Sequence, residues 1–237
     1  MCETGPASSA GGPETRGIVL LSGGLDSCVA ASWAARRYEV WLLHADYGQR
    51  TAPRERRAFD AIAAALQVPQ PRRLAVEVPL LRRLGGSSLT DASRPIEQGE
   101  PDPTRLPGTY VPFRNTHLLA GAVSWAEVIG ATRIVIGCVE EDSSGYPDCR
   151  ASYLEAFNRV VAEGARPGSG IMVEAPLLHL RKGAIVRLGV ELGAPLASTW
   201  SCYSGIERAC GRCESCRLRL RGFAEAGRED PIPYEAR

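Results

Sequence analysis

The stretch Gly17-Ile18-Val19-Leu20-Leu21-Ser22-Gly23-Gly24-Leu25-Asp26-Ser27 decides the fold. A short apolar run enters a glycine turn and an alanine-rich helical pattern follows, which predicts a strand, a turn and a helix over 24–36. Adjacent glycines let the backbone turn sharply and let a ligand approach its amides. The free amides at the start of the helix, together with its dipole, then form an anion site.

Apolar strands and amphipathic helices continue to alternate beyond this unit. Four further strands and four further helices are predicted, in chain order, over 40–45, 54–66, 74–78, 116–129, 133–138, 151–163, 171–174 and 182–192. This alternation predicts an α/β fold with a Rossmann-like, doubly wound parallel sheet of five strands. Ligands of such sheets bind at the carboxyl ends of the strands. Asp46 lies at such an end and is a candidate for a ribose or a metal, although strand-end aspartates are also common turn formers.

Composition limits the class of protein. With 237 residues, 44% of them hydrophobic, the chain can bury a full core. A net charge of +1 gives no sign of a broad nucleic-acid-binding surface, and no apolar run approaches membrane length. We expect a flexible tail over 1–16 rather than a signal peptide, a nucleotide and substrate domain over 17–198, a metal unit over 199–237, and a cytoplasmic protein.

Lys182 is the only lysine among 28 basic residues. The chain uses arginine wherever positive charge alone was needed, so a single lysine suggests a site that needs a compact ammonium group. The alternative is that the lysine occurs by chance on a solvent-exposed face. The pattern places Lys182 near the start of the helix over 182–192. A cation there is unfavourable to the helix dipole, which favours a functional role.

Two stretches near strand ends carry further candidate residues. Residues 84–109 form a long loop with little periodicity, which we interpret as a lid or a dimer contact. Arg114 follows this loop, and its planar guanidinium could hold a phosphate or a carboxylate, a surface salt bridge being the alternative.

The stretch over 140–150 follows the predicted strand at 133–138. Its acids Glu140, Asp142 and Asp148 could bind the N–H edge of a purine-like ring, with Tyr146 as a stacking face. The alternative is a polar turn that Asp148 caps before the helix at 151–163. Cys149 is either a nucleophile or, as the sequence favours, a buried structural thiol.

The last unit is Cys202-x7-Cys210-Gly211-Arg212-Cys213-x2-Cys216. Four thiolates at this spacing, interrupted by a glycine, suit a tetrahedral metal, most simply zinc in a closed structural site. An iron–sulfur cluster is the second possibility, because four thiolates also suit it.

These pieces together resemble the 7-cyano-7-deazaguanine synthase family, within the ATP pyrophosphatase (PP-loop) enzymes. The resemblance runs from about Gly17 to about Gly227. Its most specific parts are Ser-Gly-Tyr-Pro-Asp-Cys-Arg over 144–150 and the terminal cysteines, since the Ser-Gly-Gly-x-Asp-Ser loop over 22–27 is shared by many enzymes. The other matching segments are 46–50, 87–90, 111–115 and 176–182.

The resemblance implies an ATP-dependent ligase that is a homodimer with one Zn²⁺ per subunit. It implies that 7-carboxy-7-deazaguanine, ATP, Mg²⁺ and ammonia are used. A free carboxylate does not react with an amine because its oxygen is a poor leaving group. Adenylation makes that oxygen a good leaving group, ammonia gives the amide, and a second ATP activates the amide oxygen so that its loss leaves the nitrile.

The resemblance also implies roles for individual residues. The nucleotide would lie on Leu21, Ser22, Gly23, Gly24, Leu25, Asp26, Ser27, Cys28 and Asp46. Catalysis would involve Lys182, Asp26 and Arg114. The substrate would lie on Glu140, Asp142, Tyr146, Asp148 and Arg150. The metal would lie on Cys202, Cys210, Cys213 and Cys216.

The chain departs from the family pattern beside matched motifs, at Thr51, Phe113, Ser143 and Ala184. A specialised relative in an antiviral defence system, which passes the activated acyl group to a protein amine, is therefore the main alternative. A tRNA thiolase that shares the loop is a second, and the near-neutral charge argues against it. A non-catalytic, zinc-stabilised binding module is a third.

Overall fold

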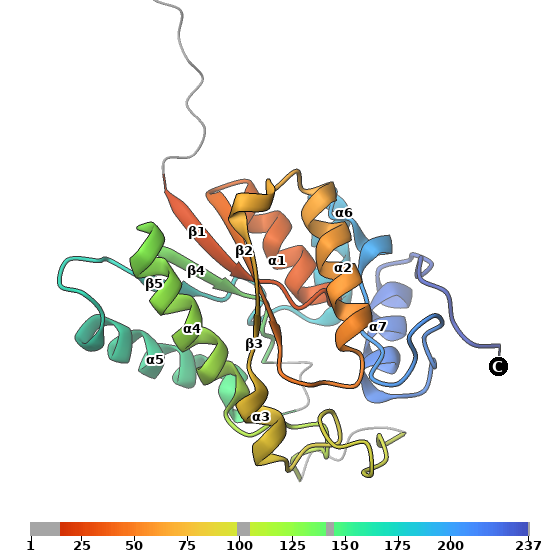
Figure 1. The fold of residues 1–237 in the computed structure, drawn as a ribbon. Helices are drawn as coiled ribbons and strands as arrows, with labels where there is room; N and C mark the ends of the chain where they lie inside the picture. Colours follow the sequence, from red (N-terminus) through yellow and green to blue (C-terminus); the bar gives the residue numbers. More distant parts are fainter. Residues whose placement is uncertain (1–14, 99–104, 141–144, 237) are drawn as a thin grey trace, which may run out of the picture.

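The predicted strands form one five-stranded parallel sheet in the computed structural model, which describes residues 15–98, 105–140 and 145–236 (Figure 1). The strand order is β3-β2-β1-β4-β5, with all pairs parallel, so the predicted fold class is confirmed. The strands are β1 (Arg16–Leu20), β2 (Glu39–Asp46), β3 (Arg73–Glu77), β4 (Arg133–Ile136) and β5 (Met172–Glu174). Most of the predicted N-terminal tail lies outside the described residues.

Helices cover both faces of the sheet. Those on one face include α1, α2, α6 and α7, and α4 and α5 cover the other (Figure 1). Within the described parts of the chain, no helix is long and apolar enough to cross a membrane. The helices are α1 (Leu25–Ala35), α2 (Ala52–Ala65), α3 (Pro79–Leu84), α4 (Arg114–Ile129), α5 (Ala151–Gly164), α6 (Lys182–Glu191) and α7 (Glu214–Glu225).

The central strand β1 supplies side chains to both core layers. Ile18 and Leu20 pack toward α4 and α5, whereas Val19 and the following Leu21 pack toward α1, α2 and α6. Successive side chains of a strand point to opposite faces, and a parallel sheet is covered on both. A continuous apolar run, rather than an alternating one, is therefore what a central strand of this sheet needs.

The strand order reverses at β1. Leu20 lies opposite Leu43 of β2 on one side and Ile136 of β4 on the other. The connection after β1 passes through α1 to β2, and the connection after its neighbour β4 passes through α5 to β5, so the connections that follow these two adjacent strands run in opposite directions. This divergence opens a crevice beyond the carboxyl ends of the strands.

Two helices were not predicted, and each has a local reason. The helix α3 has six residues and begins at a proline, so it is too short to show helical periodicity. In α7 one buried position is Arg219, which interrupts the apolar stripe on either side of it, at Cys216 and Phe223. The predicted bounds of the other elements are correct to within two residues.

The long loop after α3 packs against the rest of the protein. Leu89 and Val111 form a small buried cluster with Tyr47 and Leu81. The described end of the loop at Gln98 makes an isolated antiparallel bridge to residue 213 of the cysteine unit. Residues 99–104 lie outside the described residues, and the role of lid or dimer contact stays a prediction.

Candidate active site

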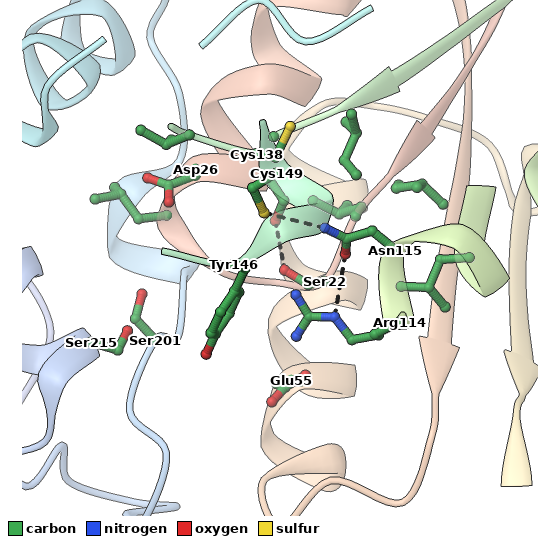
Figure 2. A pocket seen from close by; sticks show the side chains of 18 of the residues that line it. Ser22, Asp26, Glu55, Arg114, Asn115, Cys138, Tyr146, Cys149, Ser201 and Ser215 are labelled. Carbon is green, nitrogen blue, oxygen red and sulfur yellow. Dashed lines mark hydrogen bonds between the residues drawn. The ribbon is translucent and has the colours of Figure 1, made fainter. Parts of the chain in front are cut away.

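A cavity of about 260 Å³ lies at the switch point of the sheet (Figure 2). Its walls come from the ends of β1, β2 and β4, the first turns of α1, α2 and α4, and the cysteine unit. This is the predicted position for a ligand of a doubly wound sheet. Predicted site residues that line it are Leu21, Ser22, Leu25, Asp26, Ser27, Arg114, Tyr146 and Lys182.

The glycine turn forms the floor beside α1. Gly23 has a φ of +95°, and a Cβ there would lie 2.7 Å from the carbonyl oxygen of Glu55, so the turn needs glycine for both conformation and packing. The hydroxyls of Ser22 and Ser27 lie 3.0 Å apart, and the Gly24 amide donates to Ser22 Oγ at 3.2 Å. Hydroxyls and amides therefore gather at the start of α1, as an anion site requires.

Lys182 lies at the first position of α6, as predicted, and its ammonium group reaches across to α1. Its Nζ lies 2.9 and 2.7 Å from the two carboxylate oxygens of Asp26. The lysine side chain is about nine-tenths buried, whereas that of Asp26 is 28% exposed. The pair therefore presents a positive group that is held rigidly and a carboxylate that still faces the cavity, beside the glycine turn.

The lysine is positioned by the close approach of α6 and α7. A Cβ at Gly222 of α7 would lie 2.4 Å from Lys182 Cγ, and one at Gly183 of α6 would lie 2.8 Å from the Cβ of Glu225. Only residues without a Cβ allow this spacing. The helix that follows the cysteine cluster thus fixes the lysine on the far side of the cavity.

Arg114 enters the cavity at the start of α4, between two aromatic rings. Its guanidinium carbon lies 5.8 Å from the ring centre of Tyr47 and 5.9 Å from that of Tyr146. Its Nη1 donates to the Tyr47 hydroxyl at 3.5 Å and its Nε to Asn115 Oδ1 at 3.3 Å. Cation–π contacts hold the planar group in place while its donors remain directed at the cavity.

Glu55 is a cavity residue that the sequence analysis did not identify. Thr51 Oγ1 donates to one carboxylate oxygen at 2.7 Å, and Gln49 Nε2 donates to the other at 2.8 Å. Thr51, one of the departures from the family pattern, therefore orients this acid. The signal available in the sequence was the position of Glu55 in the first turn of α2, the helix that follows β2.

Other predicted residues lie outside the cavity lining. Asp46 Oδ1 accepts a hydrogen bond from the Gly48 amide at 2.8 Å and so forms the turn that was its alternative role. Cys28 is fully buried in the core of α1, and its amide donates to the Gly24 carbonyl at 3.0 Å. Arg150 is exposed to solvent.

The predicted acids of the 140–150 stretch also have other positions. Asp148 is buried, and its Oδ2 accepts from the Asn115 amide at 2.9 Å, so it caps α4 rather than the following helix. Glu140 lies 3.8 Å from His179. Asp142 lies outside the described residues, as does the departure at Ser143.

The four predicted metal ligands come together. The Sγ atoms of the cysteine unit all lie within 4.8 Å of one another. Hydrogen bonds from the neighbouring thiols of Cys213 and Cys216, followed by backbone amides, lower the pKa of Cys202. The amides of Gly205 and Cys210 donate to Cys202 Sγ at 3.1 and 3.3 Å. A compact set of amide-stabilised sulfurs fits a metal with tetrahedral thiolate coordination.

A buried ion pair joins this unit to the cavity. The guanidinium of Arg219, which lines the cavity, lies 2.7 and 2.9 Å from the two oxygens of Asp230. It also donates to Thr199 Oγ1 at 2.7 Å and, at 3.4 Å, to Ser201 Oγ.

Several residues of the cavity lining were not predicted from the sequence. They come mainly from this wall and from the ends of strands, and include Tyr47, Glu55, Asn115, Cys138, Ser201, Tyr203, Ser215 and Arg219.

The fold and the cavity define a doubly wound α/β protein with a glycine turn at the switch point of its sheet and a four-cysteine cluster beside it. The chain belongs to the QueC family: the family model of queuosine biosynthesis protein QueC matches residues 16–227.

Two relatives with high sequence identity support this family membership. A 7-cyano-7-deazaguanine synthase from Acidobacterium capsulatum is 56% identical, with 94% of this chain and 97% of the relative covered. One from Koribacter versatilis is 54% identical, with 95% and 96% covered. Among solved structures, a predicted subunit of tRNA methyltransferase from Methanocaldococcus jannaschii is similar at 12% identity and a TM-score of 0.46, with 93% of this chain and 92% of that chain covered.

Proposed function

We propose that this protein is an ATP-dependent ligase that adenylates 7-carboxy-7-deazaguanine and reacts it with ammonia to give 7-cyano-7-deazaguanine through the amide. The observation that carries the proposal is the meeting, in one cavity, of the glycine turn, the Lys182–Asp26 pair and Arg114. The names of the relatives and the family membership supply the substrate class.

The chain's own groups suit the first step. The amides and hydroxyls of the glycine turn bind the pyrophosphate portion of ATP, and the ammonium of Lys182 stabilises the negative charge that develops when the α–β phosphate bond breaks. Asp26 orients that ammonium, and its half-buried carboxylate is the group that would hold Mg²⁺, which supplies charge neutralisation at the phosphates. The carboxylate oxygen of the substrate becomes the bridging oxygen of the adenylate.

The base of the substrate fits the aromatic side of the cavity. Tyr146 offers a ring face to the base. Glu55 also lines the cavity, and hydrogen bonds from Gln49 and Thr51 fix the orientation of its carboxylate. Arg114 adds positive charge between these groups and the glycine turn. We assign Zn²⁺ to the four-cysteine cluster, where it fixes the wall that carries Ser201, Ser215 and Arg219.

Product analysis tests the proposal. The protein is incubated with 7-carboxy-7-deazaguanine, ATP, Mg²⁺ and ammonium, and the small-molecule products are identified by mass spectrometry. The nitrile with AMP and pyrophosphate is expected. No AMP, or AMP formed equally without the acid, would contradict the proposal.

The same experiment separates the alternative acceptor. Candidate partner proteins are added, and their intact masses are measured beside the small molecules. Amide without nitrile, or acyl mass added to a protein amine, would assign the chain to the conjugating relatives instead. The homodimer stays a prediction, which sedimentation of the metal-loaded protein would test.

A further inference from the structure

Two cysteines outside the metal cluster line the active-site cavity. Cys138 follows β4, and Cys149 lies in the 3-10 turn Pro147–Cys149 before α5. Asn115 Nδ2 donates to Cys149 Sγ at 3.3 Å and to the carbonyl oxygen of Asp148 at 3.0 Å, so the amide is oriented with a donor toward the sulfur. A buried sulfur that accepts a side-chain hydrogen bond inside a ligand cavity differs from a thiol that only fills space.

The surroundings favour the thiolate at one of the two sulfurs. The hydrogen bond from the Cys138 thiol lowers the pKa of Cys149, and the positive charge of Arg114 lowers it further, against the opposing effect of burial. The same hydrogen bond raises the pKa of Cys138, because its thiol is the donor. Cys28 in the core shows the contrast, because burial raises its pKa to about 12.

The sulfurs lie close to the predicted phosphate site. Gly137 immediately precedes Cys138, and a Cβ at Gly137 would lie 2.8 Å from the Ser27 amide nitrogen and 2.9 Å from the Asp26 carbonyl oxygen. The end of β4 therefore packs directly against the first turn of α1. Figure 2 shows both cysteines around the same cavity as Ser22, Asp26 and Asn115. An acyl group activated at the glycine turn would lie within this small space.

We propose that Cys149 is a catalytic nucleophile that receives the acyl group before ammonia does, an inference that rests on the proposed function. The thiolate Sγ attacks the carbonyl carbon of the acyl-adenylate, a C–S bond forms, and the C–O bond to AMP breaks with AMP leaving as the anion. Ammonia then attacks the thioester carbon. The C–S bond breaks and its electron pair returns to sulfur, which regenerates the thiolate, while the nitrogen loses its extra proton to a second ammonia molecule as ammonium.

Such a step uses the groups that surround Cys149. Cys138 and Asn115 hold the sulfur as an acceptor of hydrogen bonds, and the Arg114 guanidinium stabilises its charge. The thioester keeps the acyl group in the cavity after AMP departs, so that ammonia can enter the space that AMP leaves. Cys138 is a positioning residue, because its thiol donates a hydrogen bond to the Cys149 sulfur and does not itself touch the acyl group.

Intact-protein mass measurement tests the proposal. The metal-loaded protein is mixed with ATP, Mg²⁺ and 7-carboxy-7-deazaguanine without ammonia, and quenched in acid. We expect an adduct with the mass of the acid less one water, released by hydroxylamine and located on the peptide that contains Cys149. Cys149→Ala should lack the adduct and form amide at least about tenfold more slowly. The variant Cys138→Ala should still carry the adduct on Cys149 but form it more slowly, because the Cys149 sulfur then lacks the hydrogen bond from the Cys138 thiol.

Two outcomes overturn the account, and they are distinguishable. In the first, the wild-type protein exchanges pyrophosphate into ATP only when the acid is present, but no adduct forms and Cys149→Ala makes amide at the wild-type rate. Cys149 is then not the nucleophile, and the proposed ligase function stands. If the wild-type protein shows no acid-dependent exchange, the proposed function itself fails. Should Cys149→Ala not fold, the adduct on the wild-type protein decides alone.

Discussion

The contact between α6 and α7 makes Gly222→Ala a sharp test of how the lysine is positioned. The new Cβ would lie 2.4 Å from Lys182 Cγ, 3.0 Å from its Cβ and 3.1 Å from its carbonyl carbon. The far end of Lys182 is anchored on Asp26, so the side chain cannot simply rotate away. Either the lysine or the whole of α7 must move.

The two energetic effects of this substitution oppose each other. Alanine in a helix interior is favoured over glycine by about 1 kcal/mol. Overpacking a well-filled site costs about 1–3 kcal/mol. The net loss of unfolding free energy should therefore be about 0–2 kcal/mol. A displacement of the ammonium by about 1 Å should lower the rate of adenylation by about 10²-fold, which corresponds to about 2.7 kcal/mol and exceeds the expected loss of stability.

The assay is urea unfolding beside pyrophosphate exchange into ATP in the presence of the acid. Gly121→Ala in α4 is the matched control, since a Cβ there meets nothing within 4 Å and the position is exposed. The control should gain stability and keep its exchange rate. Wild-type exchange in Gly222→Ala, at unchanged KM for ATP, would refute the claim that α7 fixes the lysine.

Four further expectations follow from single contacts. Lys182→Met should lower pyrophosphate exchange by about 10²–10³-fold with the fold retained, and exchange near the wild-type rate would remove the lysine from catalysis. Asp230→Ala leaves the guanidinium of Arg219 buried without its carboxylate, and urea unfolding should show a loss of about 3–5 kcal/mol, whereas a loss below about 1 kcal/mol would mean the pair is not structural. Chelation of the Zn²⁺ that we assign to the four-cysteine cluster should lower the thermal midpoint and the exchange rate together, and loss of metal without either change would contradict its structural role. Burial lowers the pKa of His44 below 6.5, so its contribution to stability is full above pH 6.5 and decreases as the pH falls through the folded-state pKa. His44→Gln should therefore weaken the loss of stability below pH 6.5. The same loss in the variant would assign the pH dependence to other groups.

The sequence predicted the sheet, its direction and the ligand edge because these depend on local patterns. Apolar runs of strand length that alternate with helical periodicity leave few arrangements other than a parallel sheet with crossovers. The glycine turn and the cysteine spacing are also local, and both occupy the positions predicted for them. Lys182 was found because it is unique in the chain and lies at a helix start.

The rest depends on contacts between distant segments, which no local pattern encodes. The partner of Lys182 is Asp26, 156 positions away. Asp148 was a candidate for the substrate, with capping of the helix at 151–163 as the alternative, but its carboxylate accepts from the Asn115 amide at the start of α4. Glu55 lies in the cavity because Gly23 lets α2 approach the glycine turn. Helix-to-helix distances of this kind are set by tertiary packing.

Transfer of labelled oxygen tests the central claim most directly. The substrate is prepared with ¹⁸O in its carboxylate, and AMP is isolated after a single turnover with ammonium present. If the glycine turn holds ATP while the acid attacks the α-phosphorus, one labelled oxygen will appear in AMP. Label found only in water, or in pyrophosphate, with unlabelled AMP, would show that the acid is not adenylated and would contradict the account.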